Sequence, residues 1–250
     1  MSKALRVPIF YLPIFVGLLM WELAARTGLL DPSICPSLGA TLAAFARLID
    51  KGHLLENAWI SLFRQSSGFF LAASFGILSG MLMAQSRWVF NVLEPLLRAT
   101  FPLPKSALIP LFILWLGIGD AAKVAAVFLG CLLPVVISTY NAARGVNKQL
   151  LWSAWSLGTA KWLIPWKIVF PAALPEIMSG LRIALALSFT LMVSAEFLIG
   201  NRGLGTLIGT LGEDGDYPGM FAAVLAVTLL GFAADRLFLW LNNRLLRWRD

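Results

Sequence analysis

Five ionisable residues lie within long apolar runs of this sequence, and their side chains are its first candidates for chemistry. They are Glu22, Arg182, Glu196, Asp235 and Arg236. A charge placed in hydrocarbon costs several kcal/mol unless it is paired or hydrated, so such a residue is a functional candidate by default. Glu22, Asp235 and Arg236 lie near the ends of their runs, where a structural role at an interface also explains them. Arg182 and Glu196 are therefore the two candidates that most need an explanation.

The sequence offers none of the residue sets that catalysis or metal binding would need. It has no Gly-x-x-x-x-Gly-Lys-Ser/Thr loop for a nucleotide phosphate. Its one histidine, His53, has no Cys or His at ligand spacing, and its serines lack a base that could take their proton. Cys35 and Cys131 are too few for a disulfide scaffold. We therefore expect no catalytic residue, no metal and no cofactor in this chain.

Composition places the chain in a lipid bilayer. Of its 250 residues, 59% are hydrophobic and 13% are charged, whereas about a quarter are charged in an ordinary soluble domain. A net charge of +7 would suggest nucleic acid binding in a soluble protein, but in a membrane protein it more often records an asymmetry between loops. We expect no nucleic acid partner.

Apolar runs of helical length predict an all-α integral membrane protein with six transmembrane helices. The expected spans are residues 8–25, 66–84, 108–118, 121–140, 177–199 and 220–241. The third run, 108–118, is too short to cross a bilayer unaided, so it becomes a span only if its helix extends further or is tilted and shielded by protein.

Other local patterns complete this outline. In the second span, Gly68, Gly76 and Gly80 place small residues where helices can approach closely. Residues 86–105 are expected to form a cytoplasmic connector. Residues 41–49 predict an amphipathic surface helix whose apolar face combines Leu42, Phe45, Ala46 and Ile49.

The distribution of Lys and Arg orients the spans. With the N-terminus inside, the segments expected inside carry twice as many of these residues as the segments expected outside, which is the bias of cytoplasmic loops. Both termini then lie in the cytoplasm, as does the segment 141–176. A basic tail, 242–250, follows the last span.

One long polar break interrupts the apolar second half at residues 153–175. Gly158 can take the positive φ that ends one short helix, and Thr159 can cap the next. Pro171 with Pro175 is expected to stop that second helix. The product would be two short helices meeting at an elbow. Its exposed face would carry two lysines and three tryptophans, namely Lys161, Lys167, Trp155, Trp162 and Trp166.

The spacing within this break resembles the EAA loop of ABC-importer permeases of the MetI-like type. Ala154 is followed after four residues by Gly158, after ten more by Ile168 and after three more by Pro171, and Ser153 stands where the family usually has glutamate. In that family the loop docks on the ATPase subunit. The resemblance assigns this coupling role to Ser153, Ala154, Trp155, Gly158, Lys161, Ile168 and Pro171.

Further stretches resemble the sulfonate, taurine and nitrate branch of these permeases. They are Leu108-Ile109-Pro110-Leu111, Trp115-Leu116-Gly117-Ile118-Gly119, Ser194-Ala195-Glu196 and Arg202-Gly203-Leu204-Gly205. The resemblance implies a type I importer fold, with the first transmembrane helix and an outer amphipathic segment in 1–59, the importer domain in 60–241 and its coupling loop at 141–176.

The function implied by the resemblance is that of the permease subunit of an ATP-driven, binding-protein-dependent importer in the bacterial cytoplasmic (inner) membrane. The permease would be a homodimer resting on two ATPase subunits, which would hold the ATP and Mg²⁺. A periplasmic or lipid-anchored solute-binding protein would deliver the solute, a small organic or inorganic anion such as a sulfonate, taurine or nitrate, or else a pyrimidine or other small metabolite. A non-catalytic structural subunit of a membrane complex is the alternative from another class.

Two roles stay open for the polar residues of the fifth span. Glu196 could accept hydrogen bonds from the periplasmic turn at Gly203 and Gly205, or it could be a carboxylate at the interface. Arg182 could anchor the elbow to the span, or its charge could reach lipid phosphates. Small side chains here would suit either a pathway or simple packing. The expected lining consists of Ser188, Thr190, Ser194 and Ala195, with Trp115 from the third span.

Overall fold

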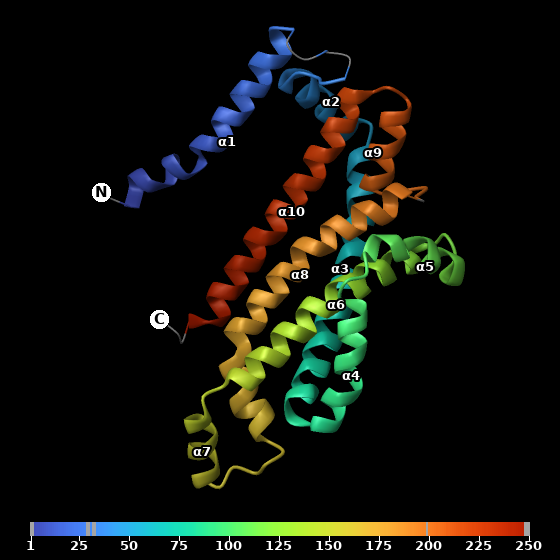
Figure 1. The fold of residues 1–250 in the computed structure, drawn as a ribbon. Helices are drawn as coiled ribbons and strands as arrows, with labels where there is room; N and C mark the ends of the chain where they lie inside the picture. Colours follow the sequence, from blue (N-terminus) through green and yellow to red (C-terminus); the bar gives the residue numbers. More distant parts are fainter. Residues whose placement is uncertain (1–2, 29–30, 32–33, 199, 248–250) are drawn as a thin grey trace.

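The computed structural model describes residues 3–28, 31, 34–198 and 200–247, without the side chains of residues 3–11 and 14. Every regular element in this part of the chain is helical, and the helices form an elongated bundle (Figure 1). A 3₁₀ turn (Lys105–Leu108) precedes α5, and a π-helical turn (Pro165–Val169) precedes α8. The α-helices are α1 (Lys3–Arg26), α2 (Leu38–Asp50), α3 (His53–Gln85), α4 (Arg87–Thr100), α5 (Ile109–Leu116), α6 (Asp120–Gly145), α7 (Lys148–Ser156), α8 (Phe170–Leu198), α9 (Leu204–Glu213) and α10 (Tyr217–Leu245).

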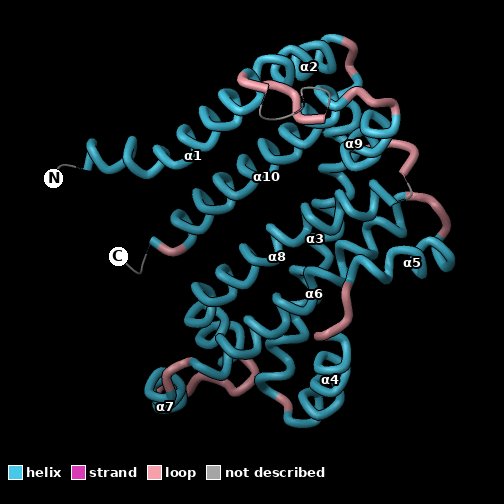
Figure 2. Tube along the Cα trace, turned by 45° about the horizontal axis from the view of Figure 1, so that its top comes forward, coloured by secondary structure: helices cyan, strands magenta, loops and turns pink. Residues whose placement is uncertain are grey.

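The bundle has two distinct ends. Helices α2 and α9 lie at one end, and α7 with the loop that follows it lies at the other (Figures 1 and 2). We call these the α9 end and the α7 end. Helix α1 is followed by α2 and runs beside α10, set apart from it along most of its length (Figures 1 and 2).

The centre of the bundle is the packing of α3, α6 and α8. Gly68, Gly76 and Gly80 of α3 lie so close to α6 that an added Cβ would come within 2.6 to 2.7 Å of an α6 side chain, and only glycine permits this approach. The α6 residues that they meet are, in order, Val127, Val135 and Thr139. Because the order is the same along both helices, α3 and α6 run parallel. The close packing expected of these glycines is confirmed. Buried residues of the three helices complete the core, among them Ala72, Cys131, Ala184 and Met192.

Four helical segments of the described chain are long and apolar enough to cross a membrane: α3, α6, Pro165–Leu198 and α10. A fifth crossing is available if α4 and Lys105–Leu116 act as one span bent by 94°. The run 108–118 is thus one arm of a bent pair, and most of the connector expected at 86–105 is helix α4. The span expected at 8–25 falls in α1, and its residues 8–11 and 14 have side chains outside the described part.

Helix α3 begins at His53, well before residue 66, where the second span was expected to begin. The extra turns carry Glu56, Asn57 and Arg64, which made this stretch resemble a loop. Arg64 and Gln65 are 3% and 2% exposed. The N-terminal part of α3 therefore buries one face that carries polar side chains, and His53 starts the helix.

Helix α2 confirms the amphipathic segment expected at 41–49, although a different face is buried. Ser37 caps its N-terminus, with the Ala40 amide donating to Ser37 Oγ at 3.2 Å. Leu42 and Ile49 of the expected apolar face are exposed. The helix instead buries a face that packs on small residues of α10 and on the start of α3, because alanine side chains allow close contact there. The buried members of this cluster are Ala44, Leu48, Leu54, Leu204, Ala222 and Ala226.

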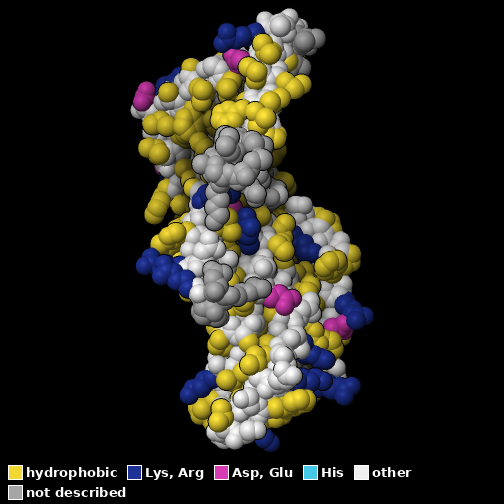
Figure 3. All heavy atoms as spheres, turned by 90° about the vertical axis from the view of Figure 1, so that its left-hand side faces the viewer, with side chains coloured by type: hydrophobic (Ala, Val, Ile, Leu, Met, Phe, Trp, Pro, Cys, Tyr) yellow, Lys and Arg dark blue, Asp and Glu magenta, His cyan; other side chains and the backbone are white. Residues whose placement is uncertain are grey.

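The surface of the molecule is rich in exposed hydrophobic side chains. They include residues of α1, α3, α8 and α10 such as Phe15, Phe70, Ile183 and Leu229. Figure 3 shows hydrophobic side chains over much of one face, with Lys and Arg side chains gathered near the α7 end. Apolar area of this extent is unusual on a soluble monomer, and contact with lipid or with a partner subunit accounts for it.

Candidate functional site

The first candidate site is the loop at the α7 end, which runs from Asn147 to Pro171. Asn147 caps α7, because its Oδ1 accepts from the Gln149 amide at 2.9 Å. At the other end of α7, Gly158 takes φ 74°, and its amide donates to the Trp155 carbonyl while the Thr159 amide donates to the Ala154 carbonyl, both at 3.0 Å. These two bonds form a Schellman motif. The positive φ predicted for Gly158 is confirmed. The residues from Ala154 to Gly158 form the C-terminal end of α7.

The second half of the loop differs from the expected second short helix. After turns at residues 161–163, the chain enters the π-helical turn (Pro165–Val169), where the Phe170 amide donates to the Pro165 carbonyl, and continues directly into α8. The stop predicted at Pro171 and Pro175 is wrong. Pro171 directly follows the π-helical turn, and the helix continues through it into the rest of α8. Pro175 removes only the donor for the Pro171 carbonyl, which belongs to an exposed residue that water can reach.

The loop offers an apolar surface with a basic edge to a partner. Ala154 is 4% exposed and anchors the loop together with Ile164 and Pro165, which are buried. In contrast, Leu157 is 82% exposed. The other outward-facing residues of the loop are Trp155, Trp162, Trp166, Ser153, Lys161 and Lys167, while Ile168 is half-buried.

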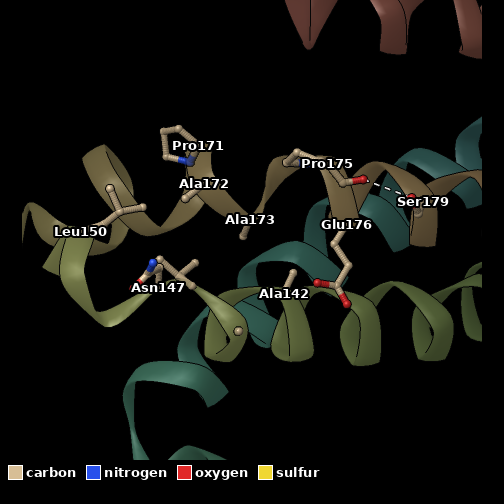
Figure 4. Close-up of a pocket in the computed structure, with 11 residues that line it drawn as sticks. Ala142, Asn147, Leu150, Pro171, Ala172, Ala173, Pro175, Glu176 and Ser179 are labelled. Carbon is tan, nitrogen blue, oxygen red and sulfur yellow. Dashed lines mark hydrogen bonds between the residues drawn. The ribbon is translucent and has the colours of Figure 1, made fainter. Parts of the chain in front are cut away.

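Behind the loop, a cavity of about 650 Å³ is lined by the end of α6, the start of α7 and the start of α8. Figure 4 shows Glu176 of α8 extending toward Ala142 of α6, with Asn147 and Pro171 at the other end of the cavity. The two helices still pack beside the cavity, because Ala142 of α6 and Ala173 of α8 belong to one buried cluster. The loop continues into α8 through the π-helical turn, so a displacement of the loop would reach α8 without a break in the helix.

The second candidate site is a buried network at the α9 end, centred on Glu196 of α8. Glu196 is fully buried, at 0% exposed, so it is not a carboxylate at the interface. Its Oε1 accepts from Arg64 Nη1 at 2.7 Å. Its Oε2 accepts from Ser61 Oγ at 2.7 Å and from the Gly205 amide at 3.0 Å. One carboxylate therefore joins α8 to α3 and to the turn that starts α9.

Helix α3 holds the same turn from the other side. The Gly203 amide donates to Asn57 Oδ1 at 2.6 Å, and the Leu204 amide donates to Ser61 Oγ at 2.8 Å. Arg64 Nη1 also donates to the Arg202 carbonyl at 2.7 Å. Asn57, Ser61 and Arg64 are spaced four and three residues apart and share one face of α3. The amides at the start of α9, which have no partners within their own helix, are thus satisfied by side chains of α3 and α8.

Gly203 and Gly205 are required by this geometry. Gly203 has φ 118°, and a Cβ there would collide with the Glu196 carboxylate. A Cβ on Gly205 would lie 2.5 Å from the Val193 carbonyl oxygen and 2.7 Å from Glu196 Cβ. The turn can approach α8 this closely only without side chains.

We expect Gly205→Ala to lower the unfolding free energy by about 1–3 kcal/mol, because a methyl group must displace backbone in a packed site. Gly209→Ala on the same helix is the matched control, since its Cβ would meet only the Phe197 ring at 3.6 Å, an ordinary contact. Thermal unfolding of the purified protein in detergent measures both. Equal melting temperatures for the two variants would mean that the turn does not need its close approach.

Arg182 is paired rather than free to reach lipid phosphates. Its Nε and Nη2 donate to the two carboxylate oxygens of Asp235 on α10, at 2.8 and 3.1 Å. Arg236 Nη2 lies 3.7 Å from the same carboxylate. The pair ties α8 to α10 at a level between the loop and the Glu196 network.

The residues expected to line a pathway fall on two different faces. Thr190 is exposed and Ser194 half-exposed on the α8 face that also carries Ile183 and Leu187, and Trp115 of α5 is 69% exposed. Ser188 and Ala195 do not share this face, and Ala195 is fully buried against Ile109 and Ala126. Ser188 is 0% exposed and its Oγ accepts from Gln65 Nε2 at 2.7 Å, so it belongs to the contact between α3 and α8.

Sequence reasoning missed the α3 half of the Glu196 network, because the second span was expected to begin only at residue 66. The face of α3 that carries Asn57, Ser61 and Arg64 continues into Gly68, and this helical periodicity was the available signal. The partner of Arg64 lies more than a hundred residues away in sequence, at Glu196. Within the described residues, no group of three His, Cys, Asp or Glu side chains could hold a metal ion.

The overall fold matches that of a known class, the permeases of type I ABC importers. A crystal form of the MetNI methionine ABC transporter in an inward-facing conformation superposes with a TM-score of 0.66 at 18% identity, covering 80% of this chain and 97% of that one. The model of the binding-protein-dependent transport system inner membrane component family matches residues 72–247. The chain belongs to this family.

Two curated relatives match nearly the full length of the chain. The putative aliphatic sulfonates transport permease protein SsuC of Escherichia coli (strain K12) is 34% identical over 98% of this chain and 92% of its own length. The formylaminopyrimidine transport permease protein ThiX of Halalkalibacterium halodurans is 31% identical over 99% of this chain and 97% of its own length.

Proposed function

We propose that this chain is the permease of an importer of small sulfonates, that it works as a homodimer on two cytoplasmic ATPase subunits, and that an external solute-binding protein supplies it. The observation that carries the proposal is the loop from Ala154 to Pro171. It presents exposed tryptophans and lysines at the α7 end and continues without a break into α8. A chain without its own phosphate loop needs such a connection to a separate ATPase.

The proposed topology has six spans: α1, α3, the bent pair of α4 with Lys105–Leu116, α6, Pro165–Leu198 and α10. Both termini and the α7 end face the cytoplasm of a bacterium, and the α9 end faces outward. The excess of Lys and Arg in the segments assigned inside supports this orientation. The proposed limits are 1–59 for the first span and α2, 60–241 for the importer domain with the coupling loop at 141–176, and 242–250 for the cytoplasmic tail.

In the proposed mechanism, closure of the ATPases on ATP draws the two loops of the dimer together. Each loop moves α8 through the π-helical turn, which continues into that helix without a break. Helix α8 carries Thr190 and Ser194 on its exposed face and Glu196 at its far end. One rigid helix therefore links the ATPase to the outward end, as alternating access requires.

Sulfonate is the proposed solute class because of the likeness to SsuC. The likeness to ThiX supports a pyrimidine as the second candidate. ATP hydrolysis is assigned to the separate ATPase subunits, which would bind the ATP and Mg²⁺.

Uptake into proteoliposomes tests the proposal. The permease is reconstituted with the ATPase and the receptor encoded beside its gene, and radiolabelled taurine, an alkanesulfonate and a formylaminopyrimidine are offered in turn. We expect accumulation of a sulfonate only when ATP is present on the ATPase side. Accumulation of the pyrimidine alone would replace the solute class, and ATP hydrolysis without uptake of any of the three would contradict a sulfonate permease.

A further inference from the structure

Lys123 of α6 is a buried cation that the network around Glu196 does not neutralise. It is 3% exposed, and its Nζ finds no hydrogen-bond partner among the described residues. Each Glu196 oxygen accepts a hydrogen bond from α3, and Arg64 holds Asp120 Oδ1, with Nη2 at 2.6 Å. A buried ammonium without an acceptor is costly, so a reason for its presence is needed.

The register of α3 on α6 sets Lys123 opposite Arg64. Gly68 lies against Val127 in the parallel seam between the helices. Arg64 precedes Gly68 by one turn, and Lys123 precedes Val127 by one turn. The seam is closed by glycines along most of its length and ends in two facing cations at the α9 end. Like charges repel strongly in a low dielectric, so this end of the seam is held together by the anions beside it.

Hydrogen bonds divide the α9 end into two parts. Arg64, Ser61 and Asn57 of α3, Glu196 of α8 and the turn before α9 form one bonded block. Among the described residues, the hydrogen bonds and ion pairs that tie this end of α6 to the block are those between Arg64 and Asp120. The Asp120 side chain is 59% exposed. One partly exposed carboxylate is therefore the polar tie between this end of α6 and the block, beside the apolar packing of Ala126 on Ala195.

We propose that Lys123 is the second partner of Asp120, used when the α9 end of α6 separates from α3 and α8 during transport. Asp120 and Lys123 are three residues apart on one helix, so they can pair when Arg64 withdraws. In the separated state Arg64 keeps its hydrogen bonds to Glu196 and to the Arg202 carbonyl. Arg64 is then paired with Glu196 and Lys123 with Asp120, and repulsion between Arg64 and Lys123 favours that state. Lys123 is a positioning residue of the outward opening, and the inference rests on the proposed importer function.

The test measures the separation directly. Spin labels are placed at the exposed positions Leu55 of α3 and Ala121 of α6 in a Cys35→Ser background, and the distance between them is measured in the reconstituted complex without nucleotide and with trapped ATP. We expect a longer distance with ATP. In Lys123→Met the equilibrium constant for the longer distance should fall roughly tenfold, and the maximal uptake rate should fall with it. Lys123→Arg should retain most of both.

Stability separates this role from a structural one. Lys123→Met removes an unpaired buried charge, so its melting temperature without nucleotide should be unchanged or higher while uptake falls. Asp120→Asn, on an exposed side chain, should populate the longer distance without nucleotide, and Lys123→Met added to it should have little further effect. Unchanged distance populations and uptake in Lys123→Met would overturn the inference. A wild type that changes distance with ATP but transports no solute would instead overturn the proposed function.

Discussion

Arg64→Met is expected to lower the unfolding free energy by about 3–5 kcal/mol, because it leaves the fully buried Glu196 carboxylate without its cation. The same change removes the donor to the Arg202 carbonyl and the bond to Asp120. The turn before α9 would lose one of its anchors on α3. Chemical or thermal unfolding in detergent, followed by tryptophan fluorescence, measures the change.

Arg47→Met is the matched control for this prediction. Arg47 pairs with Asp216 at 2.8 Å on the surface, with the two side chains 50% and 34% exposed. Breaking such a pair should cost only about 0.2–1 kcal/mol. The double variant Arg64→Met with Glu196→Leu should recover part of the loss, because it removes the unpaired carboxylate but leaves the Gly205 amide without its acceptor. A loss in Arg64→Met no greater than in Arg47→Met would show that the buried network does not stabilise the fold.

Patterns local in sequence predicted the first half of the loop from Asn147 to Pro171. The identity of Gly158 and its spacing from Ala154 predicted a helix C-terminus, because a positive φ strongly favours glycine. The same local reasoning failed at Pro171 and Pro175, because prolines in the first turns of a helix are tolerated and the π-helical turn before them leads the chain into α8. Proline alone does not distinguish the start of a helix from its end.

Features that depend on distant partners could not be predicted. A charged stretch such as residues 53–65 is an unfavourable membrane helix by composition, and it becomes favourable only when Glu196 and the turn at Gly203 supply partners. The bend of 94° between α4 and Lys105–Leu116 is likewise a tertiary feature. Glu196 could be selected as a candidate from the sequence, but its partners on α3 could not be predicted.

The second large effect is expected at Gly158. Its φ is 74° and no atom lies within 4 Å of the position of an added Cβ, so a substitution there is opposed by backbone strain and not by a clash. A β-branched residue in this region costs at least about 1–2 kcal/mol, which would break the Schellman motif and displace Ala154. Gly158→Val should therefore leave the bundle folded but change the loop surface that we propose to meet the ATPase.

Gly158→Asn is the control for this position, because asparagine tolerates the left-handed conformation. It adds a side chain of similar bulk while preserving the helix end. We expect it to assemble and transport close to the wild type. A loss of function in Gly158→Asn as large as in Gly158→Val would mean that bulk, and not backbone conformation, matters here.

The central claim is that the loop from Ala154 to Pro171 passes the work of the ATPase to α8. The most direct test is the number of solute molecules taken up per ATP hydrolysed, measured in the same proteoliposomes for the wild type, Gly158→Val and Gly158→Asn. We predict that Gly158→Val hydrolyses ATP while this ratio falls roughly tenfold or more, and that Gly158→Asn keeps the wild-type ratio. An unchanged ratio in Gly158→Val would contradict the account.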